Sequence, residues 1–273
     1  MGKLLSVNLL QRVLVALVGI PFLLWAIWVG GLVFFALVLF LALFAVFEFH
    51  HLAAEKAHPP QLWAGLLITV LFQLNGYWHY VEAWELLLAV VLLLMVMELF
   101  VKEGSPLLNL GSFLTGLLYV NLSFFSLLRL RFDAPDHQGQ VMVFLLFFCV
   151  WAADIFAYFG GSTFGGKFIQ RRLFPRLSPN KTWEGFLAGL CGSTFVAILY
   201  SYGVPQLSMT TALLAGMLIG IASPVGDLVE SMFKRDAGVK DSSSLIPGHG
   251  GVLDRFDTIL FVSPLIYFVT FYL

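Results

Sequence analysis

The chain has 273 residues, of which 60% are hydrophobic and 11% are charged, and its mean hydropathy is +0.92. Soluble domains are about 45–50% apolar and about 25% charged, so this composition excludes a soluble globular protein and predicts an all-α, polytopic integral membrane protein. The formal net charge of -1 gives no electrostatic reason to expect a nucleic-acid partner. The two cysteines, Cys149 and Cys191, have no metal-ligand spacing, so neither a disulfide framework nor a zinc site is expected.

About nine apolar segments approach the roughly 20 residues that a membrane-spanning helix needs. In chain order they are Val13–Val29, Leu32–Ala53, Leu62–Tyr80, Trp84–Val101, Gly111–Leu128, Val141–Gly160, Trp183–Gly203, Thr210–Leu228 and Phe256–Leu273. The first segment lacks a small-residue cleavage site, so we expect a retained helix and not a signal peptide. We assign residues 1–130 to N-terminal transmembrane helices and residues 131–273 to C-terminal ones that carry the site, within a single membrane domain.

The basic residues predict the orientation of these segments. If the N-terminus is cytoplasmic and the segments alternate, Arg129 and Arg131 are the only two of the 15 Lys and Arg residues that fall outside. Cytoplasmic loops carry an excess of Lys and Arg. The sequence therefore predicts a multi-pass protein of the inner (cytoplasmic) cell membrane, with both long polar loops in the cytoplasm and the C-terminus outside.

The eighth segment carries a carboxylate close to a proline. Proline breaks or kinks a helix, so we expect a half-helix that begins near Pro224 and holds Asp227 in its first turn, where a carboxylate is favoured. Glu230, Ser231 and Lys234 follow at spacings that place them on the same helix face. A capping Asp at the membrane interface is the alternative interpretation.

Two further aspartates flank Arg255 at the start of the last segment. Asp254 close to Asp227 would give two carboxylates for Mg²⁺, which proteins typically hold with one or two carboxylates and substrate phosphates. A helix N-cap is the alternative, and for Asp257 an N-cap and a supporting role behind the metal are equally open. Asp154 lies inside an apolar segment, and an intramembrane carboxylate is a functional candidate by default.

Glycines and cations surround these aspartates. Gly250 and Gly251 would let the backbone approach a ligand and expose its N–H groups, although a flexible turn is the simpler interpretation. Nearby cations could neutralise a triphosphate or a lipid phosphate, although the positive-inside rule alone also explains their number. These cations are Lys234, Arg235, Lys240 and Arg255. His249 could be a base, a donor or a structural residue.

Two motifs precede the seventh segment. Gly161 through Lys167 fits G-x-x-x-x-G-K, but Phe168 follows and no strand precedes, so we reject a P-loop NTPase and leave open a glycine-rich loop that touches phosphate. In the stretch 178–185, Ser178 or Asn180 is expected to cap the next helix, with Glu184 in its first turn. Lys181 would then be a spare cytoplasmic cation. Glu48 and Glu98 are interpreted as structural or interfacial.

The segment from Ser231 to Asp257 resembles the defining motif of the phosphatidate cytidylyltransferases, also called CDP-diacylglycerol synthases. The motif positions are filled here by Ser231, Lys234, Arg235, Lys240, Asp241, Pro247, His249, Gly250, Gly251, Asp254, Arg255 and Asp257. The stretches 154–161 and 178–185 also resemble this family, so the resemblance covers roughly the C-terminal half of the chain.

The resemblance implies that CMP is transferred from CTP to phosphatidate, giving CDP-diacylglycerol and pyrophosphate. It implies Mg²⁺ on Asp227 and Asp254, with Asp154 and Asp257 as further candidate ligands, and a second cation such as K⁺. The implied catalytic residues also include Lys234, Arg235 and His249, and the implied substrate-binding residues are Lys167, Ser178, Lys181, Ser231, Lys240, Asp241, Gly250, Gly251 and Arg255. The expected partners are CTP, phosphatidate, the lipid bilayer and a second copy in a homodimer.

Two other functions stay open. One is nucleotidyl or phosphoryl transfer to another lipid phosphate or to a polyprenol. The other is an ion-coupled transporter that uses Asp154, Asp227 and Glu230 near a broken helix. The charges gather in one cytoplasmic layer and no internal repeat is visible, which argues against a transporter.

Overall fold

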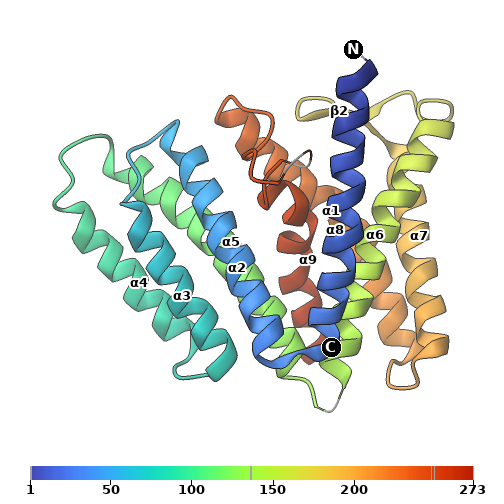
Figure 1. Cartoon of the computed structure of the whole chain (residues 1–273), viewed down its shortest axis with the longest axis horizontal. Coiled ribbons are helices and arrows are strands. Elements are labelled where there is room, and N and C mark those ends of the chain that lie inside the picture. The colour runs from blue at the N-terminus through green and yellow to red at the C-terminus, as the bar shows by residue number, and fades with distance from the viewer. Residues whose placement is uncertain (1, 136, 247, 249, 273) are drawn as a thin grey trace. The chain divides into compact units, whose positions relative to one another are not determined.

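The computed structural model describes residues 2–135, 137–246, 248 and 250–272, with side chains from Gln11 onward (Figure 1). Its helices are α1 Gly2–Val29, α2 Gly31–Ala54, α3 Leu62–Trp78, α4 Ala83–Glu98, α5 Pro106–Phe132, α6 Gln138–Phe164, α7 Trp183–Gly203, α8 Met209–Asp236 and α9 Leu253–Tyr272. Two short antiparallel strands, β1 Arg172–Phe174 and β2 Ser178–Thr182, form a hairpin between α6 and α7. The sequence did not predict this hairpin.

The helical membrane architecture is confirmed at a coarse level. In the described chain, seven helices are long and apolar enough to cross a membrane. The two shorter ones are α3 and α4, with 17 and 16 residues. The third helix stops before the expected Tyr80 because His79 adopts a left-handed conformation, with φ of 55°, and closes its C-terminus. The count of nine spans therefore stays a prediction.

The described chain divides into two compact units. Unit 1 comprises Met1–Leu128 and Asp236–Phe256, and unit 2 comprises Arg129–Arg235 and Asp257–Leu273. The segment that carries Lys240, Arg255 and the glycine pair of the motif thus groups with the N-terminal helices, whereas Lys234 and Arg235 belong to unit 2.

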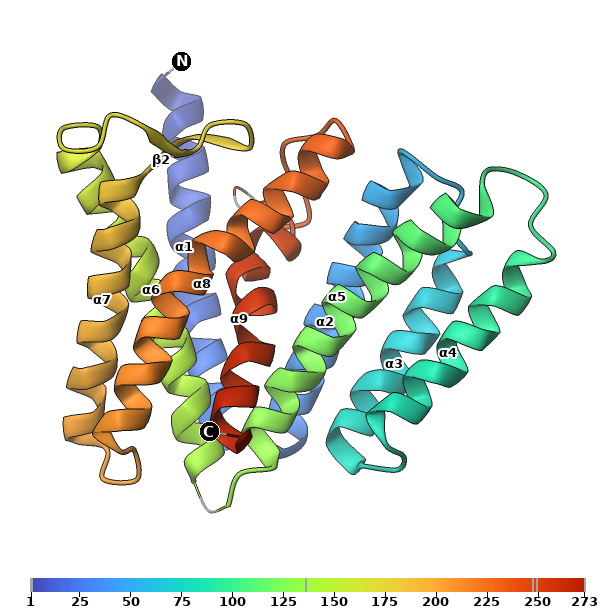
Figure 2. The same ribbon diagram turned by 180° about the vertical axis from the view of Figure 1, so that it is seen from behind.

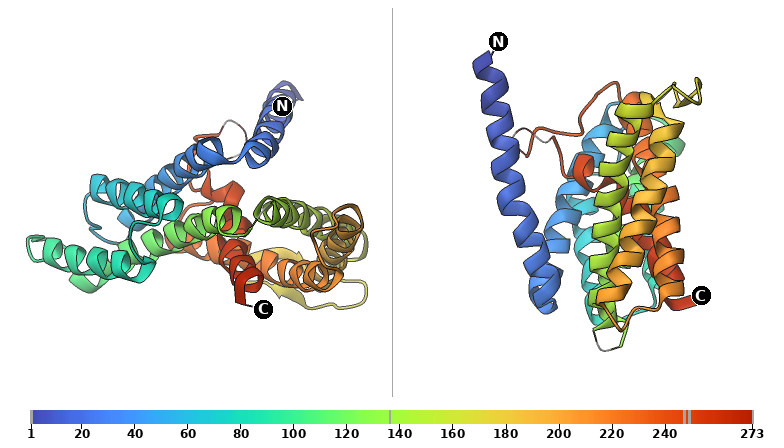
Figure 3. Two further views of the ribbon diagram at one scale, coloured as in Figure 1. Left: turned by 90° about the horizontal axis from the view of Figure 1, so that it is seen from below. Right: turned by 90° about the vertical axis from the view of Figure 1, so that its right-hand side faces the viewer.

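In unit 1, α2, α3, α4 and α5 run side by side (Figures 1 and 2). Their apolar core includes Phe72 and Leu94, both fully buried, and Phe113. A buried Asn121 amide donates to Thr69 Oγ1 at 3.2 Å and so joins α5 to α3. Helix α1 stands clear of α2 along most of its length, beyond the turn at Gly30 (Figure 3). Its exposed apolar side chains are suited to lipid contact.

In unit 2, α6 and α7 pack so closely that backbone meets backbone. A Cβ on Gly185 would lie 2.9 Å from the Ala157 carbonyl oxygen, and one on Gly189 would lie 2.9 Å from the Ala153 oxygen. Small residues permit this approach between membrane helices. Helix α8 joins them through the Ser193 hydroxyl of α7, which donates to the Gly216 carbonyl at 2.9 Å.

Two expectations about helix ends are wrong. Pro224 lies inside α8, which continues through it as one helix, and the ribbon only bends along its length (Figure 2). A proline removes one backbone hydrogen bond, and the turns on either side keep theirs, so a bend results and not a new half-helix. The cap of α7 is Thr182, whose Oγ1 accepts from Gly185 N at 3.1 Å, and neither Ser178 nor Asn180, which lie within β2.

Candidate active site

A cavity of about 450 Å³ lies within unit 2. Its walls are mainly apolar or glycine surface from α6, α7 and α8, and the end of the hairpin contributes Leu173, Asn180 and Lys181. The charged lining residues are Asp154, Lys181 and Asp227. The predicted intramembrane carboxylate and the predicted helix-face carboxylate are therefore brought to one cavity, together with a cation.

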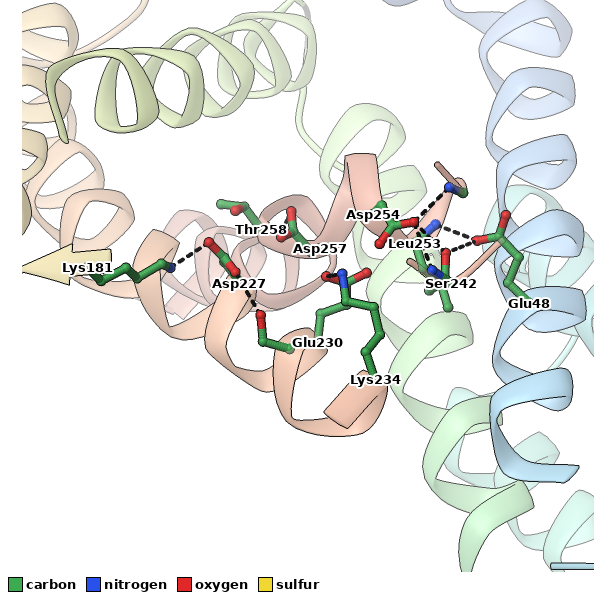
Figure 4. A network of polar contacts seen from close by, with 12 residues as sticks. Glu48, Lys181, Asp227, Glu230, Lys234, Ser242, Leu253, Asp254, Asp257 and Thr258 are labelled. Carbon is green, nitrogen blue, oxygen red and sulfur yellow. Dashed lines mark hydrogen bonds and ion pairs between the residues drawn. The ribbon is translucent and has the colours of Figure 1, made fainter. Parts of the chain in front are cut away.

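The charged centre of this cavity is an ion pair between Lys181 and Asp227. The Lys181 Nζ lies 2.5 Å from Asp227 Oδ2, and the Ser231 hydroxyl donates to Asp227 Oδ1 at 3.2 Å (Figure 4). The Lys181 and Asp227 side chains are 22% and 40% exposed, so a polar ligand can reach both. The sequence predicts that Lys181 binds substrate, or is a spare cation if capping alone explains its stretch, and it does not predict this ion pair. The pair forms because β2 ends directly before α7 and carries Lys181 to α8.

Carboxylates outnumber cations around Asp227. Asp154 and Asp257 each interact electrostatically with Asp227 and with one another, whereas Lys181 and Lys234 are the opposing charges. Such an excess of negative charge suits a cation. No group of three or more His, Cys, Asp or Glu side chains with metal-binding geometry occurs among the described residues. The residues present therefore fit a cation held by one or two carboxylates and completed by substrate phosphates, as is usual for Mg²⁺.

One predicted phosphate-binding cation is largely withdrawn from solvent. Lys234 Nζ lies 2.7 Å from Glu230 Oε2 one helical turn earlier, and their side chains are 11% and 4% exposed. Breaking a buried pair by removing one partner leaves an uncompensated charge, which is strongly destabilising. Lys234 therefore has a structural role in α8 as the partner of Glu230, in addition to any contact with substrate.

In unit 1, Asp254 organises the motif segment that precedes α9. Its Oδ2 accepts hydrogen bonds from Gly251 N at 2.7 Å, Ser242 N at 3.0 Å and Ser242 Oγ at 2.9 Å (Figure 4). Asp254 thus has the contacts that its alternative interpretation, a structural residue at the start of a helix, requires. Asp227 belongs to unit 2, and the metal site shared by the two aspartates stays a prediction.

Glu48 of α2 is the residue whose connection to the motif was missed. It is 1% exposed and accepts four hydrogen bonds, from Val252 N, Leu253 N and the hydroxyls of Ser242 and Ser243. The structural interpretation of Glu48 is confirmed, but its partners lie about two hundred residues along the chain. The one available signal was a carboxylate inside an apolar segment.

The adjacent glycines contact these carboxylates. A Cβ on Gly251 would lie 2.0 Å from Ser242 Oγ and 2.4 Å from Glu48 Oε2, and one on Gly250, whose φ is +84°, would lie 2.6 Å from Asp254 Oδ2. The glycine pair thus permits close approach of the backbone to side chains of the protein itself, and the expected approach to a ligand stays a prediction. The Gly251 N–H, however, donates to Asp254 and is not directed at an open ligand site.

Glu184 was expected in the first turn of α7, and it is there. Its Oε1 also accepts from Phe168 N at 3.1 Å and Ile169 N at 2.8 Å, and so anchors the end of the glycine-rich loop to α7. This contact was not foreseen, because the two segments are separated by the hairpin.

The remaining predicted residues differ in their exposure. The charged side chains among them are exposed and comprise Lys167, Arg235, Lys240, Asp241 and Arg255. Lys167 Nζ lies 5.8 Å from the centre of the Phe164 ring. Ser178 is half-buried at the start of β2. His249 lies outside the described residues.

Known proteins resemble this chain along nearly its whole length. A phosphatidate cytidylyltransferase of Bacillus subtilis (strain 168) is 33% identical over 96% of this chain and 98% of its own. Proteins of the same name are 36% identical in Brucella abortus biovar 1 (strain 9-941), over 95% and 92%, and 34% identical in Staphylococcus aureus (strain COL), over 96% and 97%. The cytidylyltransferase family pattern matches residues 10–273. The chain therefore belongs to the cytidylyltransferase family.

Proposed function

We propose that this protein is a phosphatidate cytidylyltransferase, which transfers CMP from CTP to phosphatidate and releases CDP-diacylglycerol and pyrophosphate. The observation that carries this proposal is the similarity to relatives of that name over more than nine-tenths of both chains. A cavity with mainly apolar walls and a charged group of Asp154, Lys181 and Asp227 suits an amphiphilic substrate that bears phosphate.

In the proposed reaction, a phosphate oxygen of the lipid attacks the α-phosphorus of CTP, and pyrophosphate leaves. Such transfers depend on positioning and charge neutralisation more than on covalent catalysis. Lys181 would exchange its contact with Asp227 for a phosphate oxygen, which its partial exposure permits. Arg235, Lys240 and Arg255 would bind phosphates from exposed positions. Lys167 and Ser178 would extend this basic rim.

The proposed cofactor is Mg²⁺, which neutralises phosphate charge when bound. Asp227 and Asp254 would hold it, with Asp154 and Asp257 as further ligands, and a second cation such as K⁺ could occupy the same carboxylate-rich surroundings. The support is the group of carboxylates that interact electrostatically around Asp227.

One assay tests the activity. Purified protein is incubated with CTP labelled in the α-phosphate, Mg²⁺ and phosphatidate, and the lipid fraction is examined for a CMP-bearing product. Parallel reactions offer another lipid phosphate or a polyprenyl phosphate. Product with phosphatidate supports the proposal, whereas product with a different acceptor alone supports the related transferase. The absence of product with every acceptor would overturn it.

We also propose that the N-terminus is cytoplasmic, that the chain crosses the inner membrane nine times and that the site faces the cytoplasm. The distribution of Lys and Arg supports this orientation. An Arg176→Cys variant places a thiol in the exposed turn of the hairpin. It should react with a membrane-impermeant reagent only after the cells are opened, and labelling of intact cells would reverse the orientation.

A homodimer is the proposed assembly. The exposed apolar side chains of α1, such as Leu17, Val18 and Trp28, offer surface for a second copy or for lipid. The mass of the detergent-solubilised protein, corrected for bound detergent, distinguishes one copy from two.

A further inference from the structure

We propose that Glu48 is a positioning residue for the proposed reaction: its buried carboxylate holds the described parts of the motif segment, residues 242–246 and 250–253, in their working conformation. This inference rests on the proposed function, because it concerns the same site. The sequence motif contains no residue of α2, so the proposal adds a residue from the N-terminal helices to the site.

The contacts of Glu48 are numerous and specific. Oε1 accepts from Val252 N at 2.8 Å and from Ser243 Oγ at 2.7 Å, and Oε2 accepts from Leu253 N at 2.8 Å and from Ser242 Oγ at 2.9 Å. Each oxygen therefore receives one backbone and one side-chain donor. Two consecutive N–H groups at the start of α9 converge on this carboxylate, an arrangement that helix N-termini favour for anions.

Glu48 is also joined to Asp254, the predicted metal ligand of the motif. The Ser242 hydroxyl oxygen lies 2.9 Å from Glu48 Oε2 and 2.9 Å from Asp254 Oδ2 (Figure 4). Asp254 Oδ2 in turn accepts from the backbone N–H groups of Ser242 and Gly251. A change at Glu48 is therefore expected to displace Asp254 through Ser242. This effect requires no contact of either carboxylate with the substrate.

A side chain of the same shape but without the negative charge cannot replace Glu48, because both of its oxygens must accept hydrogen bonds. In a Glu48→Gln variant, either orientation of the amide places an NH₂ group against a backbone N–H, of Val252 or of Leu253. Leu253 is the first residue of α9 and Val252 directly precedes it, so the helix start fixes the direction of both N–H groups. Gly251 leaves no spare room, because a Cβ there would already lie 2.4 Å from Glu48 Oε2. The segment must shift to relieve the opposed donors.

The test compares Glu48→Gln with a matched control, Glu98→Gln. Glu98 is also buried in unit 1, at 7% exposed, and accepts one hydrogen bond from Asn109 at 2.8 Å. The turnover number and the KM values for CTP and phosphatidate are measured with the labelling assay, and the melting temperature is measured in detergent. An added Ser244→Cys change, at an exposed position of the segment, reports its movement through the rate of thiol labelling.

We expect Glu48→Gln to lower the kcat of the folded protein about 10- to 100-fold, as displaced catalytic groups do, and to lower the melting temperature more than Glu98→Gln does, because the segment shifts. Labelling of Cys at position 244 should become faster in Glu48→Gln and not in the control. Ser243→Ala removes one of the four donors and should cost less than Glu48→Gln.

The proposal is overturned if kcat stays within about twofold of the wild type, which is less than a displaced group costs. It is equally overturned if activity falls only in proportion to the folded fraction, because a purely structural role predicts that result. If the wild-type protein forms no CMP-bearing lipid, the proposed function fails. The labelling rate of Cys at position 244 still tests whether Glu48 holds the motif segment in place.

Discussion

Lys181 and Asp227 form an ion pair in which Nζ lies 2.5 Å from Oδ2, and this pair joins the end of the hairpin to the middle of α8. Both residues line the cavity of unit 2. Strand β2 therefore contributes Lys181 directly to the candidate site, in addition to connecting two membrane helices.

Replacing Lys181 with Met is expected to lower kcat/KM about 100-fold or more, because one preorganised charge that stabilises the transition state is typically worth 10²- to 10³-fold. Stability should change little, since a partly exposed ion pair contributes at most about 1 kcal/mol. The labelled-CTP assay and a thermal melt measure the two effects. Arg176→Ala, in the same hairpin and exposed, serves as the control, and an equal loss of activity there would show that the effect is not specific to the ion pair.

Asp227→Asn is expected to abolish turnover while the protein remains folded in detergent. The amide keeps the shape of the side chain but removes the charge that faces Lys181 and that would bind Mg²⁺. Binding of Mg²⁺, measured by isothermal titration calorimetry, should require a higher concentration than in the wild type. Asp236→Asn, at the exposed end of α8, should behave as wild type. Near-normal turnover of Asp227→Asn would remove Asp227 from the metal site.

Gly251→Ala is expected to destabilise the protein by about 1–3 kcal/mol, the usual cost of overpacking, because the new Cβ would lie 2.0 Å from Ser242 Oγ. Activity should fall as well, since the same movement displaces Asp254. Gly111→Ala in α5 is the matched control, because a Cβ there meets nothing within 4 Å. Melting temperatures of the two variants should differ clearly, and equal values would mean that the motif segment adapts without cost.

Glu184→Gln is expected to loosen the end of the glycine-rich loop, because the neutral amide oxygen accepts from Phe168 N and Ile169 N more weakly than the charged carboxylate oxygen does. Limited proteolysis near Lys167 should become faster, with a smaller loss of activity than in Lys181→Met. Glu55→Gln, an exposed glutamate after α2, should leave the cleavage rate unchanged. Unchanged cleavage of Glu184→Gln would show that the loop is held by other contacts.

Local patterns were sufficient to predict most of the helices, and they also predicted which charged residues of α8 share a helix face. Hydropathy identified the membrane helices because a bilayer requires long apolar segments whose backbone groups are satisfied internally. The spacing of Asp227, Ser231 and Lys234 correctly predicted a shared helix face, since residues four apart meet on a helix: Ser231 contacts Asp227, and Lys234 contacts Glu230.

Contacts between distant segments could not be predicted in the same way. Glu48 meets Ser242 and Leu253 only because α2 packs beside the start of α9 in unit 1, and no local pattern encodes that neighbour. The contact of Lys181 with Asp227 was not predicted because the hairpin that directs Lys181 toward α8 consists of two short strands, whose residues alternate too briefly to form a recognisable pattern. In both cases the sequence shows the charge of the residue, but it does not show which distant residue that charge contacts.

If the lipid substrate occupies the cavity as proposed, the backbone contact between α6 and α7 affects which lipids are accepted. Gly161, Gly185 and Gly189 line the cavity as well as this contact, so part of its wall is main chain and has no side-chain rotamers with which to adapt. The width of the cavity at that wall is therefore fixed by the backbone. Lipids of different acyl composition would have to be accommodated by movable side chains such as Tyr158, Leu173 and Phe186, which makes these three the natural positions at which to broaden or narrow the range of accepted lipids.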